Sequence, residues 1–334
     1  MIGFCLAAGA GTRLLPLTRA VPKPLLAPAG RPLVDLAVEA LQAAGANRVV
    51  VNAHHGAGLL TAQLAGRPGV EVVDEPTLLG TGGGLVNAAH LGLLGGGDDP
   101  VLVTAADHVV TPGDLAALAG FLDRSGTPMA AGLVPAGAES FRLRLEGGRV
   151  ARDPEGPWDS AGAYAVRAGL LCELAPGPAS LVGRVLGPLL DRGRLAGLPF
   201  QGPMEDAGTL HRLLKTSAGL LSARWPYPLP PGRLTRGVRN GLVFLAEGAG
   251  ADPAAVLAGP VVLDAGARVG PGAVVTRSVV GPGAVVGAGA RVVGSFLGPG
   301  ARVDPGTTVT AAVVPGPGRC DSLAADSRTG GALG

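Results

Sequence analysis

A glycine-rich segment near the N-terminus carries the residues best suited to bind a polyanion. The apolar run Ile2–Ala8 leads into GAGTRLLPLTRAVPK, which ends at Lys23. Glycines that follow a strand present backbone N–H groups to an anion at close range. Arg13 lies in the turn and Lys23 follows ten residues later. The chain otherwise uses Arg in place of Lys, apart from Lys23 and Lys215. A lysine retained at this position therefore indicates a specific role.

Two common phosphate-binding loops are excluded by the spacing. No GxxxxGK[ST] sequence occurs, so the segment is not the P-loop of a kinase or ATPase. A dinucleotide-binding GxGxxG sequence needs glycine at position 14, where the chain has Leu14.

Asp107 is the clearest acidic candidate, because it ends the apolar sequence VLVTAAD. A buried strand that delivers a carboxylate at its C-terminal end places that carboxylate at the edge of the sheet. Ligands of open α/β sheets bind at this edge. The alternative is that Asp107 caps a helix, a role for which aspartate is well suited.

Alternating strands and helices must position these residues. The apolar patterns predict them over Ile2–Ala8, Leu33–Ala44, Arg48–Asn52, Leu59–Ala65, Val70–Val73, Thr81–Leu91 and Pro100–Thr104. This alternation of strands and helices is typical of an α/β fold with a doubly wound, mostly parallel sheet. Gly9–Arg13, Gly80–Gly84 and Asp107 all fall after predicted strands. The residues that follow predict antiparallel strands over Arg142–Leu145, Arg149–Val150 and Ala161–Val166, and helices over Leu181–Leu190 and Leu210–Leu221. The proline-rich sequence Trp225–Pro231 predicts a stiff linker.

The C-terminal region has a hexapeptide repeat. Its aliphatic residues recur in steps of six, with five-residue steps into Val280 and Leu297. The set is Leu263, Val269, Val275, Val280, Val286, Val292, Leu297, Val303 and Val309. Such a period predicts the stacked coils of a parallel β-helix. A disordered Gly/Pro-rich tail fits the composition but does not explain the phased aliphatic residues.

Composition excludes several classes of function. The formal net charge of +2, without a basic run, argues against a nucleic-acid partner. No apolar stretch reaches membrane-spanning length, so we expect no membrane partner. The N-terminus lacks the positive segment of a signal peptide. Cys5, Cys172 and Cys320 are widely spaced, which suits a reducing, cytoplasmic location and gives no zinc motif.

The N-terminal segment resembles the sugar-1-phosphate nucleotidyltransferase family, whose signature is GxGTRLxPLTxxxPKPL. The matching residues are Gly9, Gly11, Thr12, Arg13, Leu14, Pro16, Leu17, Thr18, Pro22, Lys23, Pro24 and Leu25. The resemblance implies a Rossmann-like doubly wound mixed sheet, the nucleotide-diphospho-sugar transferase fold, with a short C-terminal left-handed parallel β-helix. The expected parts are a catalytic domain (1–224), a linker (225–250), the β-helix (251–315) and a disordered tail (316–334).

The resemblance also implies roles for single residues. Arg13, Lys23 and Asp107 would be catalytic residues. The Arg13 guanidinium and the Lys23 ammonium would both contact the reacting phosphates. Asp107 and Asp206, the latter in EDAGT, would hold Mg²⁺. The glycines of LGTGGG would receive the base and ribose. The implied nucleotide-binding residues are Leu6, Ala8, Gly9, Gly11, Thr12, Arg13, Lys23, Gly80, Thr81, Gly82 and Gly83.

The chain departs from the family pattern at the sugar-phosphate site. Many members have a lysine in a Glu-Lys-Pro element, and here no lysine occurs between Lys23 and Lys215. Arg152 is the nearest cationic substitute, and Gly162 matches a glycine that lines the sugar pocket. Ala106 replaces a glycine before Asp107, and Met204 replaces an aromatic residue near Asp206.

The resemblance implies that a nucleoside triphosphate and a sugar 1-phosphate give a nucleotide-sugar and pyrophosphate. GTP with mannose 1-phosphate is favoured. The alternative substrates are UTP or dTTP with MurNAc, glucose or heptose 1-phosphate. The alternative function outside the enzymes is a non-catalytic regulatory subunit that binds a nucleotide-sugar. His54, His55, His90, His108 and His211 have no metal-ligand spacing, and no histidine follows to serve an acyltransferase. We expect a homo-oligomer, with the β-helix as an assembly surface.

Overall fold

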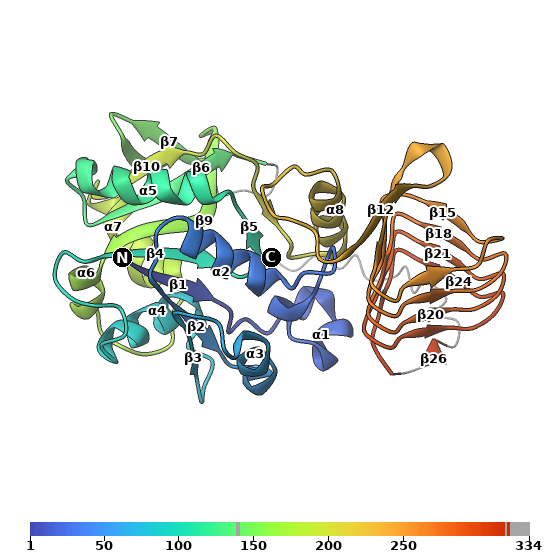
Figure 1. Cartoon of the computed structure of the whole chain (residues 1–334). Helices are drawn as coiled ribbons and strands as arrows, with labels where there is room; N and C mark the ends of the chain where they lie inside the picture. Colours follow the sequence, from blue (N-terminus) through green and yellow to red (C-terminus); the bar gives the residue numbers. More distant parts are fainter. Residues whose placement is uncertain (138–140, 318, 321–334) are drawn as a thin grey trace.

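A nine-stranded mixed sheet forms the centre of the N-terminal part (Figure 1). The computed structural model describes residues 1–137, 141–317, 319 and 320. The strand order is β3-β2-β1-β4-β9-β6-β10-β8-β7, and β1 pairs in parallel with β2 and β4. The strands are β1 (Ile2–Leu6), β2 (Arg48–Ala53), β3 (Val70–Asp74), β4 (Pro100–Ala105), β6 (Met129–Pro135), β7 (Leu143–Glu146), β8 (Arg149–Arg152), β9 (Trp158–Arg167) and β10 (Leu195–Pro199). The mixed α/β fold predicted from the sequence is thus confirmed.

Helices cover both faces of this sheet. One layer holds α2 (Leu33–Ala43), α3 (Ala57–Leu64) and α5 (Pro112–Ser125), whose apolar residues share a core with Cys5. The helix α8 (Leu210–Leu221) joins the same core but lies beyond the sheet, on the side of the C-terminal part (Figure 1). The other layer holds α4 (Gly80–His90), α6 (Ala168–Cys172), the π-helical turn η3 (Val182–Leu186) and α7 (Gly187–Asp191), which pack with Phe4. Phe4 and Cys5 face opposite layers because side chains alternate along a strand. No helix of the described ranges is long and apolar enough to span a membrane.

A two-stranded ribbon projects from the C-terminal edge of the sheet. It consists of β5 (His108–Val109) and β11 (Glu205–Asp206), which pair antiparallel with His108 opposite Asp206. The segment after α8 fastens this ribbon: the Tyr227 hydroxyl donates to the Val110 carbonyl at 2.5 Å, and the Trp225 indole N–H donates to the Pro203 carbonyl at 2.8 Å. Both aromatic rings are buried. Trp225 and Tyr227 therefore anchor the segment 225–231 to the core, although Pro226, Pro228 and Pro231 are exposed, so the segment is not a free linker.

The C-terminal part is a β-helix of three parallel ladders. All nine aliphatic residues of the predicted repeat are buried in its interior, which confirms their inward orientation. The first ladder consists of β13 (Leu242–Ala246), β16 (Val261–Leu263), β19 (Val279–Val280), β22 (Phe296–Leu297) and β25 (Val313–Val314). The second consists of β14 (Gly250–Ala251), β17 (Arg268–Val269), β20 (Val285–Val286), β23 (Arg302–Val303) and β26 (Arg319–Cys320). The third consists of β15 (Val256–Ala258), β18 (Val274–Thr276), β21 (Arg291–Val293) and β24 (Thr308–Thr310).

The two predicted five-residue steps fall at the corner before β19 and at the corner before β22. Each of these corners carries a buried serine, Ser278 or Ser295, that donates to the backbone. The Ser278 hydroxyl donates to the Thr276 carbonyl at 2.7 Å and accepts from the Ser295 N–H at 3.0 Å. Polar groups in this tight corner are thereby satisfied.

The β-helix begins and ends outside the predicted 251–315. A hairpin of β12 (Gly232–Arg236) and β13 leads into it, and β13 pairs in parallel with β16. At the other end β26 pairs with β23, so the ladder reaches Cys320. The predicted linker 225–250 is therefore largely structured. Of the predicted tail 316–334, residues 318 and 321–334 lie outside the described residues.

One ladder of the β-helix packs directly on the N-terminal part (Figure 1). The outward side chains Val262, Val279 and Phe296 belong to the same buried cluster as Leu14 and Leu17 of the glycine-rich segment. The approach is close, because a Cβ placed on Gly298 would lie 2.6 Å from Leu17 Cδ1. The β-helix thus supports the segment that carries Arg13 and Lys23.

The contact between Tyr227 and β5 gives a stability prediction. Tyr227→Phe leaves the Val110 carbonyl buried without its partner, which costs about 1–3 kcal/mol. We expect a lower midpoint of urea unfolding, with the same dependence of the unfolding free energy on urea concentration. Tyr164→Phe is the matched control, because the partner of its hydroxyl, Ser160 Oγ, still accepts from the Gly162 N–H at 3.1 Å. Equal midpoints for Tyr227→Phe and the unmodified protein would contradict this account.

Candidate active site

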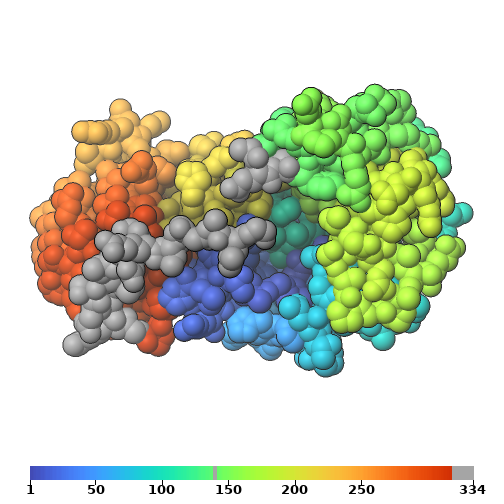
Figure 2. All heavy atoms as spheres, turned by 180° about the vertical axis from the view of Figure 1, so that it is seen from behind, coloured from blue at the N-terminus to red at the C-terminus, as the bar shows by residue number. Residues whose placement is uncertain are grey.

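A cavity of about 240 Å³ opens at the C-terminal ends of β1 and β4. Figure 2 shows this side of the molecule hollowed between the N-terminal segment (blue) and residues of the later strands (green to yellow). Seven of the residues predicted from the sequence line it: Leu6, Ala8, Gly9, Lys23, Gly80, Thr81 and Asp107. These seven residues come from three separate parts of the chain.

A buried network at one wall fixes the ends of β1 and β2. Asn52 Oδ1 accepts from the Ala7 N–H at 2.7 Å, and Asn52 Nδ2 donates to Glu75 Oε1 at 2.7 Å. Glu75 Oε2 in turn accepts from the Leu79 N–H at 3.3 Å. A Cβ on Gly84 would lie 2.4 Å from Glu75 Oε1, so this glycine makes room for the network. The network holds the backbone of the cavity wall.

Gly82 and Gly83 do not reach the cavity, in contrast to the role implied by the family resemblance. Both lie within α4, and their N–H groups donate to the Ala179 carbonyl at 2.9 and 3.0 Å. A Cβ on Gly82 would lie 2.4 Å from the Ser180 carbonyl oxygen. These glycines permit close packing of the loop at 177–181 against α4. Thr81 lines the cavity, but its hydroxyl accepts from the Leu181 N–H at 2.9 Å.

Gly11 shapes the turn that presents Thr12 and Arg13. Its φ of 63° lies in the left-handed region, and a Cβ there would be 3.0 Å from Lys23 Cβ. Thr12 and Arg13 follow in the short 3-10 turn η1 (Thr12–Leu14), and both are exposed. Across the described ranges, no hydrogen bond or ion pair engages the Arg13 guanidinium. Its Nη2 would lie 2.5 Å from a Cβ on Gly208, which places Arg13 beside the Asp206 loop.

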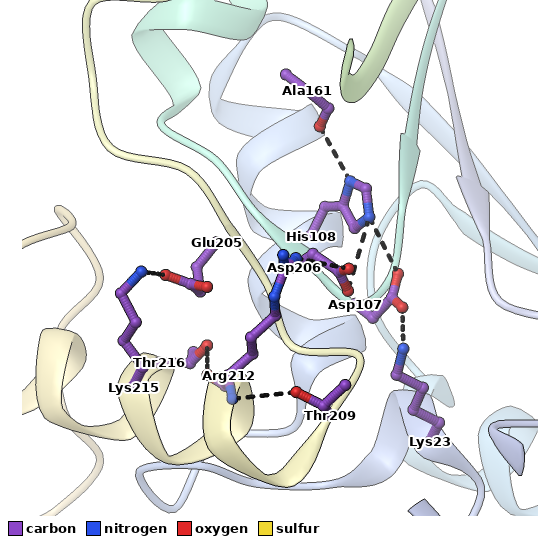
Figure 3. A network of polar contacts seen from close by, with 10 residues as sticks. All are labelled: Lys23, Asp107, His108, Ala161, Glu205, Asp206, Thr209, Arg212, Lys215 and Thr216. Carbon is purple, nitrogen blue, oxygen red and sulfur yellow. Dashed lines mark hydrogen bonds and ion pairs between the residues drawn. The ribbon is translucent and has the colours of Figure 1, made fainter. Parts of the chain in front are cut away.

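Lys23 and Asp107 join the glycine-rich segment to the end of β4. The Lys23 ammonium donates to Asp107 Oδ2, and the lysine side chain is only 10% exposed (Figure 3). Burial by itself raises the pKa of Asp107, but neighbouring His108 and Lys23 together hold that pKa below its ordinary value. The Asp107 carboxylate is therefore ionised at neutral pH and available to a cation.

Asp206 faces Asp107 from the ribbon. Its Oδ2 accepts from Arg212 Nη1 at 3.0 Å, while its Oδ1 is buried without a hydrogen-bond partner among the described residues. One oxygen each of Asp107 and Asp206 and one ring nitrogen of His108 lie within 4.8 Å of one another. Two carboxylate groups, one of them with an unpartnered oxygen, fit a divalent cation such as Mg²⁺.

Gly162 and Arg152, the predicted sugar-phosphate residues, lie in different surroundings. Gly162 has φ 65°, and a Cβ there would be 1.9 Å from His108 Nδ1, so it adjoins the carboxylate cluster. Arg152 on β8 pairs with Asp191 at 3.3 Å and stacks over Phe141. None of these contacts of Arg152 is to a residue of the cavity. The structure thus brings Gly162, but not Arg152, to the site.

Sequence reasoning missed two residues of the site, His108 and Asn52. His108 follows Asp107 directly, yet its place opposite Asp206 depends on the pairing of β5 with β11. His108 therefore belongs to a group of residues that could hold a metal ion, which its spacing in the sequence did not indicate. Asn52 lines the cavity from the end of β2, and a polar residue at the C-terminal end of an apolar strand was the available signal.

Comparisons with known proteins agree on one family. The Nucleotidyl transferase family model matches residues 2–139. A mannose-1-phosphate guanylyltransferase from Mycobacterium tuberculosis is 31% identical over 297 residues, which covers 82% of this chain and 78% of that protein. An N-acetylmuramate alpha-1-phosphate uridylyltransferase from Neisseria meningitidis serogroup B is 31% identical over 248 residues, covering 67% of this chain and 100% of that protein.

A solved structure shares the fold. It is a Bacillus anthracis protein, named as a candidate glucose-1-phosphate thymidylyltransferase and solved with bound sucrose. The TM-score is 0.57 at 19% identity, and the match covers 65% of this chain and 94% of that chain. At this identity the likeness concerns the fold alone.

The crowding around Gly208 gives a prediction for the site. In Gly208→Ala the added methyl would lie 2.5 Å from Arg13 Nη2 and 2.6 Å from Asp206 Oδ1, so both groups must shift. A displacement of about 1 Å in a positioned group costs on the order of 100-fold in rate. We expect kcat/KM to fall by about that factor while the circular dichroism spectrum is unchanged.

The matched control is Gly58→Ala, which adds the same methyl to the exposed surface of α3 with nothing within 4 Å. Its kcat/KM should equal that of the unmodified protein. Full activity of Gly208→Ala would show that Arg13 and Asp206 are not held at the reacting groups.

Proposed function

The chain belongs to the nucleotidyl transferase family, and we propose that it transfers a nucleotidyl group from GTP to mannose 1-phosphate, giving GDP-mannose and pyrophosphate. The single observation that carries the proposal is the grouping of four charged residues: Lys23 and Asp107 line the cavity, Asp206 lies beside Asp107, and Arg13 lies beside the Asp206 loop. Cationic side chains and a paired-carboxylate metal site are the groups that phosphoryl transfer requires.

The extent of the matches supports mannose 1-phosphate over MurNAc phosphate. The match to the Neisseria uridylyltransferase covers all of that protein but only 67% of this chain. The match to the Mycobacterium guanylyltransferase covers 82% of this chain and must therefore extend well into the C-terminal region. A relative that shares part of the β-helix region is the better guide to the substrate. The uridylyltransferase activity is the second candidate.

In the proposed reaction, a phosphate oxygen of the sugar 1-phosphate attacks the α-phosphorus of the triphosphate. A new P–O bond forms at the α-phosphorus while its bond to the β-phosphate oxygen breaks, and pyrophosphate leaves in line. No covalent enzyme intermediate is needed, so catalysis depends on positioning and electrostatics.

Each residue has a separate task in this reaction. The exposed and unpaired Arg13 guanidinium binds the triphosphate and offsets the charge that develops on the departing pyrophosphate. Lys23 orients Asp107 through the ion pair and adds positive charge beside the phosphates. Asp107 and Asp206 would hold Mg²⁺, which when bound neutralises phosphate charge. The backbone at Leu6–Gly9 and the loop at Gly80 form the walls for the nucleotide.

The first test is pyrophosphate release with Mg²⁺, measured for four nucleoside triphosphates against a panel of sugar 1-phosphates. We expect release with GTP and mannose 1-phosphate. In Asp107→Asn the rate should fall by about 100-fold or more, because a ligand charge and the partner of Lys23 are lost together. Release confined to UTP with MurNAc 1-phosphate would replace the proposed substrates. Nucleotide-sugar binding without any release would identify a regulatory subunit.

Arg13 gives a second test of the mechanism. Arg13→Ala should lower kcat by about 10²–10³-fold, the usual effect of removing one group that stabilises developing charge. Arg13→Lys should restore only part of the rate, because an ammonium lacks the planar two-pronged contact of a guanidinium. The control is Arg19→Ala, a neighbouring exposed arginine on α1 (Leu17–Ala20). A rise in KM at constant kcat in Arg13→Ala would assign Arg13 to substrate binding alone.

A further inference from the structure

His108 is held between the two carboxylates by three chain segments. Asp107 lies in the turn after β4, His108 opens β5, and the pairing with β11 sets Asp206 opposite His108. Figure 3 shows the imidazole ring with one nitrogen toward Ala161 and the other toward the carboxylates. The ring is therefore anchored on one side and presented to the cation site on the other.

The anchoring contact fixes which ring nitrogen carries the hydrogen. His108 Nδ1 lies 3.0 Å from the Ala161 carbonyl oxygen. A carbonyl oxygen only accepts hydrogen bonds, so Nδ1 must be the donor. In the neutral ring, Nε2 then carries a free lone pair. Histidines that ligate metals are held in this way, with the other ring N–H donated to a carbonyl or carboxylate.

The two carboxylates each use one oxygen for a cationic side chain and turn the other toward Nε2. Asp107 Oδ2 is bound by Lys23, and Asp107 Oδ1 lies 3.8 Å from Nε2. Asp206 Oδ2 is bound by Arg212, and the unpartnered Asp206 Oδ1 lies 4.0 Å from Nε2. Three lone-pair atoms thus converge, and no described residue donates a hydrogen bond to Asp206 Oδ1. A bound cation would satisfy all three.

The separations suit a shared ion. Two ligand atoms about 2.1 Å from one octahedral ion lie about 3.0 Å apart in adjacent positions and about 4.2 Å apart in opposite positions. The distances of 3.8 and 4.0 Å from Nε2 lie between these two values, so small inward movements of the side chains would make the three atoms adjacent ligands. They are too long for direct hydrogen bonds between the ring and the carboxylates. The geometry therefore favours a common ligand over direct pairing.

We propose that His108 Nε2 is a third protein ligand of the divalent cation. The inference rests on the metal site of the proposed function and adds to it a ligand and a cation preference. Imidazole nitrogen suits first-row transition cations, whereas Mg²⁺ favours oxygen ligands. His108 thus raises the affinity for Mn²⁺ or Co²⁺ relative to Mg²⁺.

The test is Mn²⁺ binding to the full-length protein, read from the electron paramagnetic resonance signal of free Mn²⁺. His108→Asn should weaken Mn²⁺ binding by about tenfold or more, since even indirect partners of a ligating histidine cost 10–100-fold when changed. Mg²⁺ affinity, measured by competition, should change less. The control is His54→Asn, because His54 also bonds a backbone carbonyl, that of Glu75 at 2.7 Å, but lies outside the cluster.

Pulsed resonance spectra of the Mn²⁺-loaded, unmodified protein give a readout that needs no variant. We expect ¹⁴N hyperfine coupling from a directly bound nitrogen. Mn²⁺ binding that is lost in Asp206→Asn but shows neither ¹⁴N coupling nor dependence on His108 would overturn the inference and leave the proposed function intact. A higher KM for sugar 1-phosphate in His108→Asn, at unchanged Mn²⁺ affinity, would instead make His108 a substrate contact. Absence of pyrophosphate release would overturn the proposed function separately, whatever the Mn²⁺ result.

Discussion

The ion pair between Lys23 and Asp107 is the contact on which the site depends. It joins the glycine-rich segment that follows β1 to the turn that follows β4, two segments separated by 84 positions in the sequence. Both groups are largely buried, and a buried charge is costly unless it is paired. The pairing therefore fixes the segment against the sheet edge and keeps the Asp107 carboxylate ionised.

The C-terminal β-helix contributes to the same constraint from the other side. Its outward residues Val279 and Phe296 share a buried cluster with Leu17, which lies between Arg13 and Lys23 in the segment. Residues 225–231 do not act as a tether either, because Tyr227 and Trp225 fasten the ribbon that carries His108 and Asp206. The β-helix and the segment before it are thus part of the scaffold of the site, which gives the C-terminal region a structural link to catalysis beyond any role in assembly.

The sequence predicted the local elements well and the long-range contacts poorly. The helix over Leu210–Leu221 and the inward residues of the β-helix follow directly from apolar periodicity. No element was assigned to 108–135, where β5, α5 and β6 lie, and the strand of His108 has only two residues. The position of His108 opposite Asp206 comes from the pairing of β5 with β11, almost a hundred positions away in the sequence. No local pattern in the sequence encodes this pairing. Gly82 and Gly83 lie in α4 against the loop at 177–181, and a glycine that permits close packing looks in the sequence like one that receives a ligand.

Gly208, Gly162 and the cationic side chains of Arg212 and Lys23 help to position the charged groups of the site before substrate arrives. Gly208 leaves room for Arg13 beside Asp206, and Gly162 leaves room for His108. Arg212 and Lys23 each take one carboxylate oxygen, so the remaining oxygens can point only toward the space near His108 Nε2. Groups fixed in this way need little reorganisation when charge develops on the phosphates, and preorganisation of this kind is the main source of electrostatic catalysis. The compact backbone around the site is therefore as important to the chemistry as the charged side chains themselves.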